Sequence, residues 1–205
     1  MIIRHLGITD FAVTCLAMQQ FSATRTVDTP DELWLTEHYP VYTLGLNRNN
    51  VRLPVESNIP LVLTDRGGKM TYHGPGQLIV YLLLDLKRHH LNVRKLVSIL
   101  ENSVIALLAK NGVNARAKLD APGVYIGEAK IAALGLRIKN NYCYHGLSLN
   151  INMDLKPFDA IDPCGYVGLE VTQTSNLGIV ANVQEFSELL VEMFTAQLSD
   201  GCKHD

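Results

Sequence analysis

DRGGKMTYHGPGQLIVY, residues 65–81, sets four glycines and a proline between two apolar runs, residues 61–63 and 78–80. Glycine lets backbone N–H groups approach a ligand without a Cβ in the way. Thr71, Tyr72 and His73 lie between the glycine pairs and can act on a bound carbonyl. A connection that only reverses the chain needs about two to five residues. The stretch therefore predicts a binding loop between two strands.

Length and composition predict a single domain spanning residues 1–205. The chain has 205 residues with 47% hydrophobic content, enough for one sizeable core. Its net charge of −2 gives no general attraction to nucleic acid or to an anionic membrane. No apolar run approaches the roughly 20 residues that span a bilayer, and the N-terminus lacks a signal-peptide pattern. We therefore expect a cytoplasmic monomer that binds neither nucleic acid nor membrane.

The pattern of apolar residues predicts an α+β fold. Strands outnumber helices and do not alternate with them regularly, which argues against a doubly wound α/β sheet. Residues 78–84 are apolar nearly throughout, as in a strand that is buried on both faces. Helices are expected at residues 10–25, 93–110 and 183–198. Strands are expected at residues 2–6, 32–39, 42–45, 61–64, 78–86, 115–119, 123–126, 130–139 and 142–152.

The cysteines offer one candidate nucleophile. Four occur, at positions 15, 143, 164 and 202, without a CxxC pair or zinc-type spacing, so we expect neither a metal site nor a disulfide framework. Cys164 lies between a proline and a glycine, at a stiff and sharply bent point. Cys15 falls on the apolar face of a predicted helix. Cys164 is therefore the candidate, and an inert structural thiol is the alternative.

A nucleophilic thiol needs a neighbour that favours the thiolate. Lys130 is suited to this, because it enters GEAKIAALG, residues 127–135, where an unpaired ammonium would be costly. A surface lysine at the start of a strand is the alternative. His73 and His145 are rival bases, which would give a protease-like Cys–His pair. The glycines match no phosphate-binding motif, so a nucleotide site is poorly supported.

Four ordered blocks resemble the octanoyltransferases of lipoate biosynthesis, the lipoate–protein ligase B family. They are RGGxxTYHGPGQL at residues 66–78, KIAAxG at 130–135, HGxxxN at 145–150 and PCG at 163–165. Their order makes the match specific. One departure is that leucines follow Tyr81 where many members have a proline, and it touches none of the chemical positions.

The resemblance implies a biotin/lipoate protein ligase-like fold, with mixed β-sheets flanked by helices, and a two-step acyl transfer that uses no cofactor. Octanoyl passes from acyl carrier protein to a cysteine, then to a lysine of a lipoyl domain in a 2-oxoacid dehydrogenase or the glycine cleavage H protein. Carried over by residue, Cys164 accepts the acyl group and Lys130 activates it. The implied substrate contacts are Arg66, Gly67, Gly68, Lys69, Met70, Thr71, Tyr72, His73, Ala133, Leu134, Gly135, Gly146, Leu147 and Ser148.

Three alternatives remain open at this point. One is an ATP-dependent lipoate–protein ligase on the same fold, and another is a cysteine-dependent amidotransferase between two lipoyl-type domains. The third is a non-catalytic module that binds acyl groups or lipoyl domains. Because acyl carrier proteins are acidic, we also expect docking on the basic residues Arg66, Lys69, Arg137 and Lys139.

Overall fold

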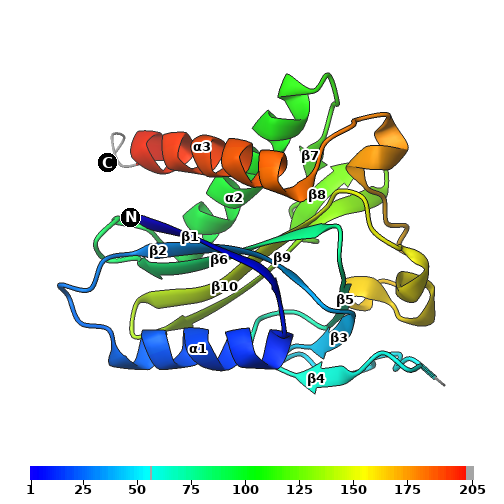
Figure 1. Cartoon of the computed structure of the whole chain (residues 1–205), viewed down its shortest axis with the longest axis horizontal. Coiled ribbons are helices and arrows are strands. Elements are labelled where there is room, and N and C mark those ends of the chain that lie inside the picture. Colours follow the sequence, from blue (N-terminus) through cyan, green and yellow to red (C-terminus); the bar gives the residue numbers. More distant parts are fainter. Residues whose placement is uncertain (56, 202–205) are drawn as a thin grey trace.

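A computed structural model describes residues 1–55 and 57–201, without the side chains of Cys164 and Asp200. It contains a seven-stranded sheet with helices on both faces and a three-stranded sheet at one end (Figure 1). The strands of the large sheet follow the order β1 (Ile2–Thr9), β2 (Glu32–His38), β6 (Gln77–Asp85), β10 (Tyr142–Asn150), β9 (Ala129–Lys139), β8 (Gly123–Ile126) and β7 (Arg116–Ala117). β1 and β2 run parallel, and the other neighbours are antiparallel. The expected α+β class with mixed sheets is confirmed.

The small sheet corrects the prediction for residues 65–77. Its order is β4 (Leu61–Leu63), β3 (Val41–Leu44) and β5 (Met70–His73), with β5 antiparallel to β3. Part of the expected loop is therefore a strand. Four residues between glycine pairs are too short to show a periodic pattern, and only the pairing with the distant β3 makes them extended.

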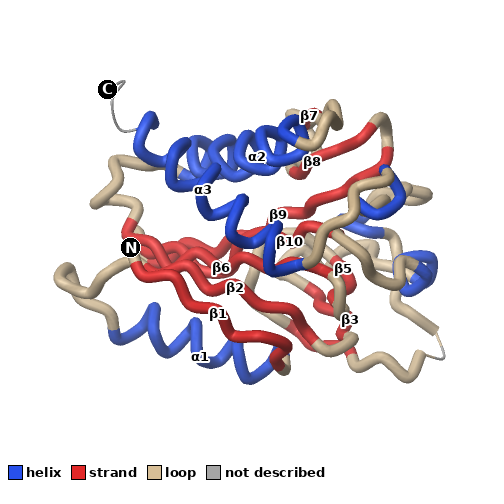
Figure 2. The backbone as a smooth tube through the Cα atoms, turned by 45° about the horizontal axis from the view of Figure 1, so that its top comes forward, coloured by secondary structure: helices blue, strands red, loops and turns tan. Residues whose placement is uncertain are grey.

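Two helices cover one face of the large sheet. α2 (Val93–Lys110) has the predicted bounds, and it begins where Asn92 Oδ1 accepts a hydrogen bond from Lys95 N at 2.8 Å. α3 (Val183–Gly201) packs against α2, and the two share a core with the sheet. Figure 2 shows both helices on the same side of the strands.

The third helix, α1 (Phe11–Thr24), covers the opposite face (Figure 2). Its Phe11 and Met18 pack against Ile79 and Tyr81 of β6, whereas Leu82 of the same strand faces α2 and α3. β6 is buried along its whole length, which confirms the prediction for residues 78–84. β6 is therefore an interior strand of the sheet that apolar packing stabilises on both faces.

After β10 the chain forms 3₁₀ turns at Lys156–Ala160, Pro163–Gly165 and Thr174–Leu177. Phe158 and Ile161 close a third core against Tyr42, Met70 and Tyr72 of the small sheet. This packing brings the turn Pro163–Gly165 next to β5. Among the described residues, no helix is both long enough and apolar enough to cross a membrane.

Candidate active site

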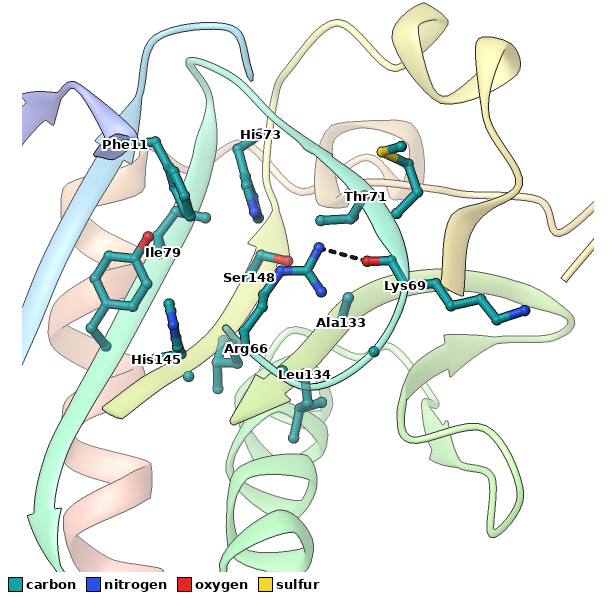
Figure 3. Close-up of a pocket in the computed structure, with 16 residues that line it drawn as sticks. Phe11, Arg66, Lys69, Thr71, His73, Ile79, Ala133, Leu134, His145 and Ser148 are labelled. Atoms are coloured by element: carbon teal, nitrogen blue, oxygen red, sulfur yellow. Dashed lines mark hydrogen bonds between the residues drawn. The ribbon is translucent and has the colours of Figure 1, made fainter. Parts of the chain in front are cut away.

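A narrow pocket lies between α1, residues 66–73 and the strands β6, β9 and β10 (Figure 3). We call it the acyl pocket. Its lining is Phe11, Arg66, Gly68, Lys69, Met70, Thr71, His73, Ile79, Tyr81, Ala133, Leu134, Gly135, His145, Gly146, Leu147 and Ser148.

Small residues of β9 and β10 allow a close approach of the chain to this part of the sheet. In the register of these strands, Ala133 lies opposite Ser148 and Gly135 lies opposite Gly146. Strand residues two positions apart share a face, so these two pairs lie one behind the other along the sheet. A Cβ on Gly135 would lie 3.1 Å from Gly67 O, so this glycine lets residues 66–67 pass close to the sheet, and the small side chains of Ala133 and Ser148 line the pocket beside it.

Arg66 fixes the shape of the segment that lies over these strands. Its guanidinium donates hydrogen bonds to Thr43 O at 2.7 Å, Lys69 O at 2.8 Å and Gly67 O at 2.9 Å, and the residue is 8% exposed. Figure 3 shows the bond to Lys69. The expectation that Arg66 docks an acidic protein is therefore wrong, because its charge is buried and used internally.

Two of the histidines at this site are held neutral. Burial lowers the pKa of His73 to about 3, and the ring bonds Gln77 Oε1 at 2.7 Å. Burial also lowers the pKa of His38 to about 4, and its Nε2 lies 2.6 Å from the hydroxyl of Tyr81. Neutral rings add no charge to this part of the site, which suits an alkyl ligand.

His145 has an unusual backbone and a carboxylate partner. Its φ of +62° lies in the left-handed region, where a residue other than glycine is strained. Its Nε2 lies 2.9 Å from Asp65 Oδ1, and the hydroxyl of Tyr144 donates to Asp65 Oδ2. Burial lowers the pKa of His145, whereas the hydrogen bond from His145 holds the pKa of Asp65 below its usual range. The pair is therefore a neutral imidazole that donates Nε2–H to a carboxylate.

Cys15 lies beside this pair, and one donor atom each from Cys15, Asp65 and His145 lie within 4.8 Å of one another. Burial raises the pKa of the Cys15 thiol, which disfavours the thiolate that a metal ion would bind. His145 Nε2 and Asp65 Oδ1 are already paired with each other. We interpret the cluster as a hydrogen-bond network.

Lys130 is buried, which overturns the surface alternative; it is 3% exposed. Its backbone is held by Glu170 O at 2.8 Å and Thr172 N at 2.9 Å. Its ammonium donates to Pro122 O at 3.2 Å and lies 5.2 Å from the centre of the Tyr125 ring. Glu101, on α2, interacts electrostatically with it. The site thus contains a buried and well-positioned cation.

The turn Pro163–Gly165 adjoins Lys130 and the acyl pocket. Pro163 and Lys130 line one small cavity together with Thr71, Ala133 and Ser148, which also line the acyl pocket. The backbone of Cys164 therefore lies where the acyl pocket meets Lys130, although the structure does not describe its side chain.

Two other cysteines are poor candidates. Burial raises the pKa of the Cys143 thiol to about 12, and burial also raises that of Cys15. Cys202 lies outside the described residues. The role of Cys164 as nucleophile stays a prediction.

The structure gathers most of the predicted substrate contacts in one place. Gly67 and Tyr72 are the exceptions: Gly67 lines a neighbouring groove beside Lys130, and Tyr72 is buried between Tyr42 and Phe158. Sequence reasoning did not place four lining residues in the pocket, namely Phe11, Ile79, Tyr81 and His145. The alternation along β6 could have pointed to Ile79 and Tyr81, whereas nothing local places Phe11 there.

Comparison with known proteins decides the family. The model of the lipoyl protein ligase A/B catalytic domain matches residues 12–195. The chain belongs to this family. The octanoyltransferase of Laribacter hongkongensis is 55% identical over 197 residues, which cover 96% of this chain and 95% of the relative. The octanoyltransferase of Dechloromonas aromatica is 53% identical over 96% of both chains. The predicted resemblance is confirmed.

Solved structures of the same fold support the architecture. A lipoate–protein ligase A bound with ATP superposes with a TM-score of 0.77 at 14% identity, covering 97% of this chain and 85% of that one. The biotin protein ligase of Aquifex aeolicus gives 0.62 at 12% identity, covering 100% and 72%. The biotin/lipoate protein ligase-like fold expected for this family member is confirmed.

Proposed function

We propose that this protein is an octanoyltransferase, which moves octanoyl from acyl carrier protein through a thioester on Cys164 to a lysine of a lipoyl domain. The observation that carries the proposal is that the acyl pocket, Lys130 and the turn with Cys164 adjoin one another. The acyl pocket shares Thr71, Ala133 and Ser148 with the cavity that contains Lys130 and Pro163. An alkyl chain in the pocket would therefore place its carbonyl carbon beside Lys130 and the turn that carries Cys164.

In the first step the Cys164 thiolate attacks the carbonyl carbon of the incoming thioester. The bond from that carbon to the pantetheine sulfur breaks, and the departing thiolate takes a proton from Lys130. The octanoyl group is held as a thioester before this step, on the carrier protein, and after it, on Cys164. The exchange is therefore nearly isoenergetic and needs no ATP. Lys130 favours the attacking form of Cys164, because a nearby ammonium stabilises a thiolate.

In the second step the amine of the acceptor lysine attacks the Cys164 thioester. Lys130, now neutral, accepts a proton from that amine as a general base. The bond between carbon and Cys164 sulfur breaks and leaves a thiolate beside an ammonium, which is the starting pair. The product is an amide on the acceptor. Backbone N–H groups near Cys164 or the segment 66–73 are candidates to stabilise the oxyanion in each step.

The proposed partners follow from this chemistry. The donor is octanoyl-acyl carrier protein, and the acceptors are lipoyl domains of 2-oxoacid dehydrogenases and the glycine cleavage H protein. We further propose that residues 1–205 form one catalytic domain, which the family match over residues 12–195 supports. A cytoplasmic location and a monomeric state stay predictions.

Intact-mass spectrometry tests the proposal directly. After incubation with octanoyl-acyl carrier protein, the protein should gain one octanoyl group, and peptide mapping should place it on Cys164. Adding a lipoyl domain should then discharge the protein and acylate the domain. Cys164→Ala should abolish both events, whereas Cys143→Ala, the matched control, should retain them.

The same assay separates the alternatives. An ATP-dependent ligase would instead acylate the lipoyl domain from free octanoate and ATP, and would exchange pyrophosphate into ATP. An amidotransferase between lipoyl-type domains would load from an octanoylated domain and ignore acyl carrier protein. An adduct that maps to Cys15 or Cys143, or full activity in Cys164→Ala, would refute the assignment of the nucleophile.

A further inference from the structure

We propose that Phe11, Ile79, Tyr81 and His145 form an end wall that sets the length of the acyl chain, so that octanoyl fits and longer chains are excluded. This inference rests on the proposed function, because it takes an acyl chain as the ligand of the pocket. It assigns a specificity role to residues outside the predicted set of substrate contacts.

The end wall lies at the far end of the pocket from the reaction centre. Lys130 and Pro163 adjoin the pocket at Thr71, Ala133 and Ser148, and no member of the end wall lines that shared cavity. In the register of β9 and β10, the pair Gly135–Gly146 lies beyond Ala133–Ser148 as one moves away from Lys130.

Two further observations fix this direction. On β6, Tyr81 lies opposite Gly146 and Ile79 lies opposite Ser148, so both are two strands away from β9, which carries Lys130. Figure 3 shows the rings of Phe11 and His145 near Ile79, on the opposite side from Thr71 and Ala133. A chain that enters beside Lys130 therefore meets the end wall with its methyl terminus.

The end wall cannot recede easily, because the residues that back it are packed and hydrogen-bonded. The hydroxyl of Tyr81 is 2.6 Å from His38 Nε2, and the ring of Phe11 stacks on His73 with centroids 5.9 Å apart. The exposed fractions of Phe11 and Tyr81 are 3% and 4%. Extra methylenes pushed into a packed interior force side chains out of their preferred rotamers. A longer acyl chain would meet this resistance.

His145 joins the end wall because of its unusual backbone. The left-handed backbone at His145 lets its ring stack on that of the preceding Tyr144, with centroids 5.1 Å apart, although adjacent strand residues normally point to opposite faces. Its Nε2–H donates to Asp65, so Nδ1 is an acceptor, and Nδ1 is buried with no hydrogen-bond partner among the described residues.

Nδ1 has no contact with solvent, so it presents no hydrogen-bonding atom to the chain. His145 therefore contributes to the end wall through the surface of its ring.

Chain-length competition tests the proposal. Hexanoyl-, octanoyl-, decanoyl- and dodecanoyl-acyl carrier protein would be offered to the whole protein, with kcat/KM measured for each. Phe11→Ala and Ile79→Ala should raise the ratio of decanoyl to octanoyl at least about tenfold, since one methylene in an apolar pocket changes selectivity by about that factor. Phe11→Trp should shift the preference towards hexanoyl.

Phe21→Ala is the matched control, because Phe21 lies on the same helix and packs in the same core without lining the pocket. Its chain-length ratio should equal that of the wild type. Phe11→Leu, a milder change, covers the case in which Phe11→Ala unfolds, and thermal unfolding is recorded for every variant.

The possible failures can be told apart. If the wild type transfers octanoyl but folded variants at positions 11 and 79 keep its chain-length profile, the end wall is refuted and the proposed function stands. If the wild type transfers no acyl group from the carrier protein, the proposed function itself fails.

Discussion

At the residue scale, Lys130 is buried and lines the same small cavity as Pro163, which precedes Cys164. We expect Lys130→Met to raise the pKa of the Cys164 thiol, because removing a nearby cation destabilises the thiolate. The rate of Cys164 alkylation, followed against pH by mass spectrometry, measures that pKa. Lys139→Met is the control, since Lys139 is an exposed lysine on the same strand. Identical pH profiles for all three proteins would mean that Lys130 does not lower the pKa of Cys164. A histidine such as His73 would then be the candidate base.

Arg66 illustrates a different use of charge, since its guanidinium shapes the backbone over the pocket. Arg66→Lys should destabilise the fold by about 1–3 kcal/mol, because an ammonium cannot reach Thr43 O, Gly67 O and Lys69 O together and leaves buried acceptors unpaired. Urea unfolding measures the loss. Arg48→Lys should be nearly neutral by comparison, because Arg48 makes one long bond, of 3.3 Å, to Gly45 O. Equal losses at both positions would argue against the network.

At the scale of elements, the turn into β6 depends on a glycine. Gly76 has a φ of +84°, and a Cβ there would lie 1.9 Å from Asn152 O. We expect Gly76→Ala to lose about 1–3 kcal/mol from the strained φ and more from the contact with backbone. Gly112→Ala measures the cost of the strained φ alone, because Gly112 has a φ of +74° with open space around it. Chemical denaturation compares the two. A loss at Gly76 no larger than that at Gly112 would contradict the close contact.

The elements also show what the sequence could and could not reveal. Asn92 and Gly112 mark the ends of α2 by local chemistry, and the predicted range 93–110 is confirmed. The apolar run of β6 signals burial on both faces, and this prediction is confirmed too. β1 extends to Thr9 and not to Leu6, because it pairs with β2 along that length. β5 was missed for the same reason: its partner is distant in the sequence.

Within the site, sequence motifs reveal some residues, whereas others are brought together only by long-range packing. The residues around Lys130 and Cys164 belong to motifs that can be read directly. The end wall, in contrast, combines the first residue of α1 with β6 and β10, and these meet only after the helix packs on the sheet. The left-handed backbone of His145 has no signal in its neighbours either. Such features follow from tertiary packing.

At the scale of the whole molecule, the net charge of −2 leaves an acidic partner to be attracted by local lysines. We expect the KM for octanoyl-acyl carrier protein to rise with ionic strength while kcat changes little, because the screening length falls from about 10 Å at 0.1 M to about 3 Å at 1 M salt. Lys69→Glu and Lys139→Glu should raise the KM at low salt, and Lys110→Glu, on α2, serves as the control. A KM indifferent to salt would indicate docking through apolar contacts.

The buried histidines couple the stability of the whole fold to pH. Their folded-state pKa values, about 4 for His38 and about 3 for His73, lie below the value of 6.5 for an unperturbed histidine. The unfolded chain therefore binds more protons below pH 6.5, and the folded state loses stability as pH falls. Each histidine should contribute a slope on the order of 1 kcal/mol per pH unit between about pH 6 and pH 4.

Urea unfolding across that range measures the combined slope. His38→Gln and His73→Gln should each reduce it even where the substitution lowers the stability overall, because the slope reports proton binding alone. His5→Gln, at an exposed histidine, should leave it unchanged. A wild-type stability that stays flat from pH 6 to pH 4 would mean that the two rings take up protons in the folded protein. The neutral state inferred for His38 and His73 at the site would then be wrong as well.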